Sequence, residues 1–260
     1  MTPQVPQYVL SLESILRPFV MIIALGLIWS GAARMPASAK SRYTTATVLS
    51  AVFIGWEVVA QYLGAANTYL ATIENPPAVP TILFGLLAPL AVAAIALWRS
   101  DSAARLVSAI PLHWLVAAQV YRVAGGIFLV LWAGGRLPWQ FALPAGIGDV
   151  TTGIVAVVLA ARLAQDSIGA HGAIYVWSLF GIADLVVAIA MGAITSPGQA
   201  HLLALEAPNL LVTAYPLVMV PTFAVPLAHA PWPRSFAAAA RDRPDRPGGG
   251  GLTRRPHHQH

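Results

Sequence analysis

Seven long apolar runs restrict how this chain can fold. A helix of about 20 residues, rising about 1.5 Å per residue, crosses about 30 Å of hydrocarbon. The runs lie near residues 16–33, 45–66, 79–98, 109–133, 141–162, 174–194 and 205–228. Because 57% of the residues are hydrophobic and only 10% are charged, the chain has too little polar surface to cover a soluble globule. The sequence therefore predicts an all-α bundle of seven transmembrane helices in residues 1–230.

Basic residues are concentrated in alternate segments between these runs. These segments hold Arg34, Lys40, Arg42, Arg99, Arg105 and Arg162. By the positive-inside rule, this pattern places the N-terminus outside and the C-terminus in the cytoplasm. Residues 231–260 are rich in Pro, Gly and Arg and cannot bury apolar surface, so we expect a disordered basic cytoplasmic tail. The net charge of +5 thus reflects membrane topology, and we expect no nucleic-acid partner.

The two halves of the chain show a weak internal similarity. A shift that aligns Glu57 with Asp184 also aligns Pro89 with Pro216. Spans one to three would then repeat as spans five to seven, a 3+1+3 arrangement. Parallel repeats occur in some transporters, whose substrate sites lie near the membrane midplane. In so apolar a chain, identities of this kind also arise by chance, so the repeat is one of two interpretations.

Four charged residues lie inside the apolar runs: Glu57, Arg122, Asp149 and Asp184. Each costs at least about 2.5–3.5 kcal/mol at bilayer depth on insertion scales, so such residues mark functional sites by default. Small residues lie one helical turn from Arg122, Asp149 and Asp184. Because small residues let helices approach closely, we expect these faces to point into the bundle.

Uncharged polar residues accompany these charges. Gln61 lies one turn from Glu57, Gln119 lies one turn from Arg122, and Asn209 lies in the last run. We expect the polar and charged side chains to converge on one cavity that opens to the outside. Asp149, Asp184 and Glu57 are the candidate catalytic or titrating residues, and Arg122, Gln119, Gln61 and Asn209 are the candidate substrate-binding residues.

The three acids outnumber the one arginine. If all were ionised, the cluster would carry a net charge of about −2 in a low-dielectric environment, which is too costly to persist. A proton, a cation or a cationic substrate would restore the balance. The alternative is that Arg122 bridges two carboxylates as a structural contact with no further role.

Metal and cofactor sites are not indicated by the sequence. The chain has no cysteine, and its single lysine, Lys40, lies in a connecting segment, which excludes a retinal Schiff base. His113, His171 and His229 fall at the cytoplasmic ends of three predicted spans, where interfacial histidine is favoured over a haem or metal ligand. We therefore expect neither a metal nor a cofactor.

Four sequence strings resemble a group of bacterial multi-pass membrane proteins. They are QVYRVAGGIF, FALPAGIGDVTTG, WSLFGIADL and VPTFAVPLAH, within residues 110–229. The resemblance implies a bacterial inner-membrane protein and points to Gln119, Arg122, Asp149, Asp184 and His229, but it implies no activity. The dipeptide Trp56-Glu57 in the second of seven spans is slightly similar to integral-membrane terpene cyclases, which use buried acids to protonate an isoprenoid.

Three functions fit these features. The first is a multi-pass protein of the bacterial inner membrane that binds and transports a small solute or cation with proton coupling. The second is an intramembrane enzyme that uses a buried carboxylate as a general acid on a lipid or isoprenoid substrate. The third is a structural or assembly subunit whose buried charges hold the bundle together.

Overall fold

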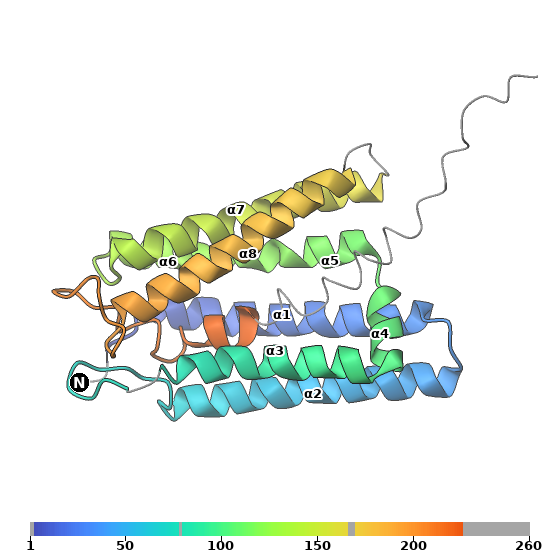
Figure 1. The fold of residues 1–260 in the computed structure, drawn as a ribbon, viewed down its shortest axis with the longest axis horizontal. Coiled ribbons are helices and arrows are strands. Elements are labelled where there is room, and N and C mark those ends of the chain that lie inside the picture. Colours follow the sequence, from blue (N-terminus) through green and yellow to red (C-terminus); the bar gives the residue numbers. More distant parts are fainter. Residues whose placement is uncertain (1–2, 78–79, 166–169, 226–260) are drawn as a thin grey trace, which may run out of the picture.

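The computed structural model describes residues 3–77, 80–165 and 170–225 (Figure 1). The predicted tail, residues 231–260, and His229 lie outside this part of the chain. Within it the protein is all-helical, with eight α-helices, two short helices of other types and no strand. The elements are α1 (Gln7–Arg34), α2 (Ala39–Ala65), α3 (Ile82–Arg99), α4 (Asp101–Ser108), α5 (Leu112–Ala118), η1 (Gln119–Gly125), α6 (Gly126–Ala133), α7 (Trp139–Ala164), α8 (Ala170–Thr195) and η2 (Val220–Ala224).

Six helical stretches in the described residues are long and apolar enough to cross a membrane. They are α1, α2, α3, the continuous stretch Leu112–Ala133, α7 and Gly172–Thr195 of α8. Large apolar side chains such as Ile54, Phe84 and Val176 are exposed on these helices, as expected where lipid is the solvent. The structure therefore has the architecture of a multi-pass membrane protein.

The fourth stretch is built from three pieces. The α-helix α5 tightens into the 3₁₀ helix η1 and then continues as α6. Gly125 and Gly126 lie at the second junction, where their low helix propensity weakens a continuous α-helix. A 3₁₀ stretch inside a helix often marks a functional or strained position. Here it carries Arg122.

The described part of the predicted seventh helix, residues 205–225, does not form a continuous helix. It consists of turns and bends followed by the short π-helical element η2. Pro208, Pro216 and Pro221 lack the backbone N–H that a helix needs, which explains the interruption. Irregular backbone is tolerated at membrane depth only where protein buries it. Most residues from 209 to 224 are indeed buried. The proposed 3+1+3 repeat thus has no second helix equivalent to α3 among the described residues.

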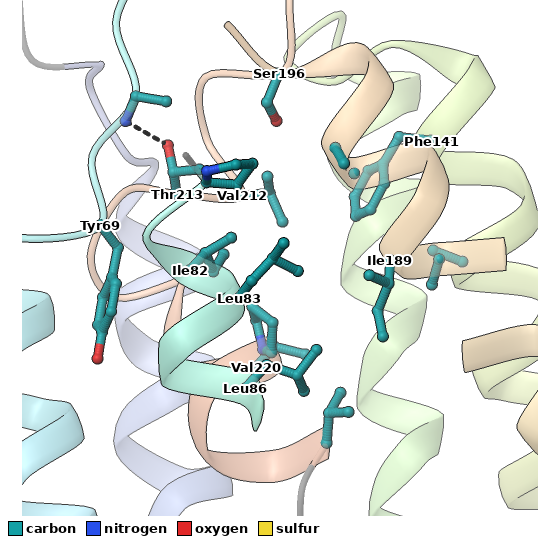
Figure 2. A pocket seen from close by; sticks show the side chains of 18 of the residues that line it. Tyr69, Ile82, Leu83, Leu86, Phe141, Ile189, Ser196, Val212, Thr213 and Val220 are labelled. Atoms are coloured by element: carbon teal, nitrogen blue, oxygen red, sulfur yellow. Dashed lines mark hydrogen bonds between the residues drawn. The ribbon is translucent and has the colours of Figure 1, made fainter. Parts of the chain in front are cut away.

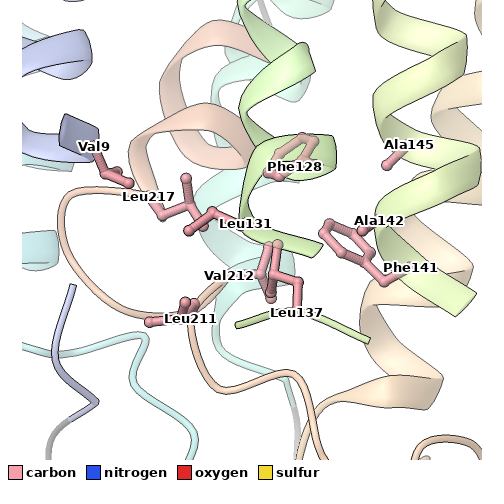
Figure 3. Close-up of a cluster of buried hydrophobic side chains, with 10 residues drawn as sticks. All are labelled: Val9, Phe128, Leu131, Leu137, Phe141, Ala142, Ala145, Leu211, Val212 and Leu217. Atoms are coloured by element: carbon pink, nitrogen blue, oxygen red, sulfur yellow. The ribbon is translucent and has the colours of Figure 1, made fainter. Parts of the chain in front are cut away.

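We call residues 196–225 the final segment. Figure 1 shows η2, its helical part, beside α1 and α3. Figure 3 shows how it packs: Leu211, Val212 and Leu217 contact Phe128 of α6 and Phe141 of α7 in one apolar cluster. A second cluster joins Met219 and Phe223 to α1, α2 and η1. The final segment therefore packs against α1, α2, η1, α6 and α7.

The two ends of the bundle carry different charges. Figure 1 shows successive long helices running in opposite directions, with α4 at one end and the connection of residues 66–81 at the other. Of the charged residues described, the α4 end holds Arg34, Lys40, Arg42, Arg99, Arg105, Arg162 and one acid, Asp101. The opposite end holds Arg136, Glu74 and Glu206. The basic connections predicted from the sequence thus lie together.

Candidate functional site

Arg122, Asp149 and Asp184 form a buried ion-pair cluster in the middle of the bundle. The guanidinium Nε of Arg122 donates a hydrogen bond to Asp149 Oδ1 at 2.8 Å. Its Nη2 donates to Asp184 Oδ2 at 2.5 Å. The Arg122 side chain is only 7% exposed. Hydrogen bonds between charged groups are about twice as strong as neutral ones, so these two bonds fix the geometry of η1, α7 and α8.

Three glycines make room for this cluster. A Cβ atom at Gly148 would overlap the Asp184 carboxylate, and one at Gly125 would overlap the Asp149 side chain. A Cβ at Gly181 would lie 3.3 Å from Arg122 Nη1. The small residues noted in the sequence therefore act at the charges themselves, because they let the three helices approach closely enough for ion pairs to form.

An apolar cavity of about 100 Å³ leads to the cluster. Figure 2 shows its walls: Ile82, Leu83 and Leu86 of α3 face Phe141 of α7 and Ile189 of α8. We call it the triad pocket. Its lining runs from Ser196, the residue after α8, along this helix to Asp184, twelve residues, or about 18 Å at the helical rise. The carboxylates of Asp149 and Asp184 lie at its deep end.

The end of the triad pocket farthest from the cluster, which we call its mouth, is lined by two connecting segments. Residues of the 66–81 connection, including Tyr69, and of the final segment, including Ser196, line it. The Ala71 N–H donates to the Thr213 hydroxyl at 3.1 Å, which ties the two segments together (Figure 2). Burial raises the pKa of Tyr69 above its ordinary value, so this phenol is neutral at physiological pH.

Glu57 does not join the cluster. It lies instead beside Arg17 of α1, whose Nη1 donates to Glu57 Oε1 at 3.2 Å. Arg17 Nε also lies 2.9 Å from Glu13 Oε1, one turn earlier on α1. The expected convergence of Glu57 with Arg122 is therefore not found. A second acid–arginine–acid group exists in its place, and the four-residue spacing of Glu13 and Arg17 was the signal for it in the sequence.

The three predicted polar residues without charge lie at other sites. Gln61 donates to the Tyr215 hydroxyl at 2.9 Å. Asn209 is fully buried, its Oδ1 accepts the Val212 N–H at 3.2 Å, and its Nδ2 lies 3.5 Å from Thr195 Oγ1, so it organises the final segment. Gln119 lines a different, larger cavity. None of the three lines the triad pocket.

Aromatic walls of the triad pocket were not predicted. Phe128 and Phe141 pack edge to face with ring centroids 5.2 Å apart, and both line the pocket. Their positions in apolar runs did not indicate a pocket, because an aromatic residue in a core and one that lines a pocket occur in the same kind of sequence. The chemistry of the site is thus a hydrophobic, partly aromatic pocket that ends at two carboxylates and one guanidinium.

The ion-pair cluster has one more negative group than positive groups, so it favours the binding of one additional positive charge. With both aspartates ionised and Arg122 cationic, the net charge is −1, which one proton or one monovalent cation neutralises. Among the described residues, no group of three or more His, Asp or Glu side chains is placed to hold a metal ion.

Fold and site together define a multi-pass helical membrane protein with an aspartate–arginine–aspartate cluster inside the bundle. Residues 76–230 match the family described as Domain of unknown function (DUF8737). Because the match covers more than half of the chain, the protein belongs to this family. The matched region holds α3 to η2 and the whole ion-pair cluster, whereas Glu13, Arg17 and Glu57 lie outside it. No curated protein and no solved structure matches the chain.

Proposed function

We propose that the protein binds a small organic cation in the triad pocket and moves it across the membrane in exchange for a proton. The observation that carries this proposal is the pairing of two carboxylates with one guanidinium at the deep end of an apolar pocket. A charged group at this depth is costly unless it has a role, and a net charge of −1 attracts a cation.

The walls of the pocket favour a particular kind of cation. Phe128 and Phe141 can face a positive charge, and the remaining lining is almost entirely apolar. A strongly hydrated inorganic ion would lose its water in such walls without compensation. A cation with a hydrocarbon body loses less hydration, so alkylammonium compounds are the substrate class that fits best.

Proton coupling follows from the same charge balance. The cluster is neutral with one proton or with one bound cation, but not with both. Proton and substrate therefore compete for the two aspartates, and each promotes release of the other by mutual exclusion. Exchange across the membrane would use this competition, with Asp149 and Asp184 as titrating residues and Arg122 as their fixed partner.

The direct test is binding and transport of tetraethylammonium. We expect the purified protein to bind radiolabelled tetraethylammonium saturably, more tightly as the pH rises, because protons then compete less. In proteoliposomes, a tetraethylammonium gradient should drive proton movement, reported by a trapped pH-sensitive dye. Asp184→Asn and Asp149→Asn should abolish both signals. Glu57→Gln is the matched control, because Glu57 pairs with Arg17 away from the pocket, and it should retain them. Binding that survives Asp184→Asn would contradict the proposal.

A second function is supported by the aromatic pair. An intramembrane enzyme could use one protonated aspartate as a general acid on an isoprenoid, with Phe128 and Phe141 shielding a carbocation. Trp56 and Glu57, which carry the similarity to terpene cyclases, do not line the triad pocket, so the acid of this candidate would be Asp149 or Asp184. Membranes supplied with a prenyl alcohol should then yield a cyclised product that is lost in Asp184→Asn.

The site fits a location in the inner membrane of a bacterium, with the basic α4 end in the cytoplasm. In this orientation the mouth of the triad pocket faces outward, between the 66–81 connection and the final segment. The positive-inside rule supports this orientation. Nearly all the described basic residues that lie at helix ends or in connecting segments are at the α4 end.

A further inference from the structure

A second cavity, of about 470 Å³, lies in the other half of the bundle. It is bounded by α1, α2 and α3, with α4 and α5 at its basic end. Its lining is almost entirely apolar. Two of its few polar side chains are directed to backbone carbonyls: Trp56 Nε1 donates to Thr222 O, and Tyr121 Oη donates to Ala224 O. We call it the lipid cavity.

The size of the lipid cavity calls for an occupant. Protein interiors are close-packed, and an apolar cavity of about 150 Å³ already binds benzene in a soluble protein. Ligand pockets span about 300–1,000 Å³, and this cavity falls within that range. Lining atoms without contact partners lose dispersion energy, which an apolar ligand restores. A hydrocarbon chain is therefore the kind of ligand that fits this cavity.

The cavity opens sideways toward the bilayer. Val52 and Val59 of α2 and Val92 of α3 line it, and each is close to half exposed. Both helices are membrane-spanning by length and composition, so this exposure is to lipid. Gly55 on the same wall faces open space, since an added Cβ would meet nothing within 4 Å. A hydrocarbon chain can thus enter from the membrane between α2 and α3.

The helices that line the cavity carry arginines at their α4 ends. Arg42 lies seven residues before Leu49, a lining residue, and so on the same face of α2. Its Nε and Nη1 donate to the carbonyls of Ala37 and Ala33, so Nη2 is the nitrogen that would meet a phosphate. On α3 the lining ends at Leu97, and Arg99 follows. The short helix α4, which carries the exposed Arg105, contributes Val107 to the lining. A molecule with its hydrocarbon chain in the cavity would present its other end to these arginines.

We propose that the lipid cavity holds one acyl chain of an anionic phospholipid, whose phosphate is bound by the arginines at the α4 end. Basic residues at the end of a gap between membrane helices are the general pattern for anionic-lipid recognition. The cavity matches the apolar chain and the α4 end matches the negative head group, whereas a neutral lipid would match only the first. The site is separate from the triad pocket and does not depend on the transport proposal.

Lipid binding is tested on the full-length protein in detergent. Dioleoyl phosphatidylglycerol and dioleoyl phosphatidylcholine, which have identical chains, are added separately, and retained lipid is measured by native mass spectrometry alongside the thermal unfolding temperature. We expect phosphatidylglycerol to be retained preferentially, by about fivefold for each arginine that contacts the head group. Equal retention of both lipids would overturn the anionic part of the proposal.

Two variants separate the cavity from general lipid contact. Gly55→Phe fills the open space and should abolish retention of phosphatidylglycerol, whereas Gly26→Phe, at an exposed α1 position that does not line the cavity, should not. If Gly55→Phe fails to fold, Ala93→Leu on the α3 wall gives a smaller filling. Arg42→Gln combined with Arg99→Gln should remove the preference for the anionic head group. Undiminished lipid retention in both filled variants would overturn the proposal. Asp184→Asn should retain lipid whether or not transport is lost, because Asp184 does not line the lipid cavity.

Discussion

Arg122 and Arg17 each lie between two acids, but their surroundings differ. The Arg122 side chain is 7% exposed and that of Arg17 is 32% exposed. Taking charges out of water is expensive, and a buried pair is most sensitive to the loss of one partner. The two groups therefore look alike in composition but should respond differently to substitution.

The first prediction concerns Arg122→Ala. Removal of the guanidinium leaves Asp149 and Asp184 buried without a counter-charge, and we expect a loss of about 3–5 kcal/mol in the free energy of unfolding. Unfolding in mixed micelles of increasing denaturing detergent measures it. Arg17→Ala is the control and should cost less, since Arg17 is partly exposed. The double variant Arg122→Ala/Asp184→Asn should regain part of the loss. If Arg122→Ala were as stable as the wild type, the ion pairs would contribute nothing.

The second prediction concerns the space around the carboxylates. Gly148→Ala introduces a methyl group where the Asp184 carboxylate lies. Overpacking of this kind typically costs about 1–3 kcal/mol, and it should also displace Asp184 from Arg122. We expect a lower unfolding temperature and weaker tetraethylammonium binding. Gly26→Ala, whose new methyl group meets no atom within 4 Å, should change neither property measurably.

At the scale of the element, the final segment shows that hydropathy alone does not predict whether an apolar run forms a helix. Its apolar run was interpreted as a seventh helix, because a buried irregular segment and a membrane helix need the same apolar composition. The prolines indicated an interruption but not its extent. What replaces the helix is a set of contacts to α6, α7 and α8, and these depend on the arrangement of the other helices.

The third prediction tests what holds the final segment in place. Asn209→Ala leaves the buried Val212 N–H without its acceptor and removes the Asn209 Nδ2 donor from the Thr195 hydroxyl, which keeps its own bond to Met191 O. An unsatisfied buried polar group costs about 1–3 kcal/mol. We expect faster amide hydrogen exchange across residues 196–225, with α1 and α2 unchanged. Gln199→Ala, at an exposed position of the same segment, should leave the exchange rates at wild-type values. Equal rates in the two variants would show that Asn209 does not anchor the segment.

For the whole molecule, the charge difference between the two ends predicts orientation. The α4 end carries six described cations and one acid, so we expect it in the cytoplasm. The chain has no cysteine, which permits clean labelling of single substitutions.

The fourth prediction follows from this orientation. Asn75→Cys, in the 66–81 connection, should react with a membrane-impermeant maleimide in intact cells. Ser108→Cys, at the end of α4, should react only after the membrane is opened. Both positions are exposed, so a difference in labelling reports sidedness and not burial. The reverse pattern would place the mouth of the triad pocket in the cytoplasm.

The sequence by itself determined the helical membrane architecture, the basic end and the buried charges Arg122, Asp149 and Asp184. Each of these follows from a local cost, because apolar length, loop charge and a charge at bilayer depth can be read from one segment at a time. Only the tertiary structure decided that Glu57 pairs with Arg17, that Gln119 faces the lipid cavity, and that the last apolar run fills the bundle without forming a helix. These outcomes depend on which helices lie next to each other, and packing between distant segments sets that arrangement.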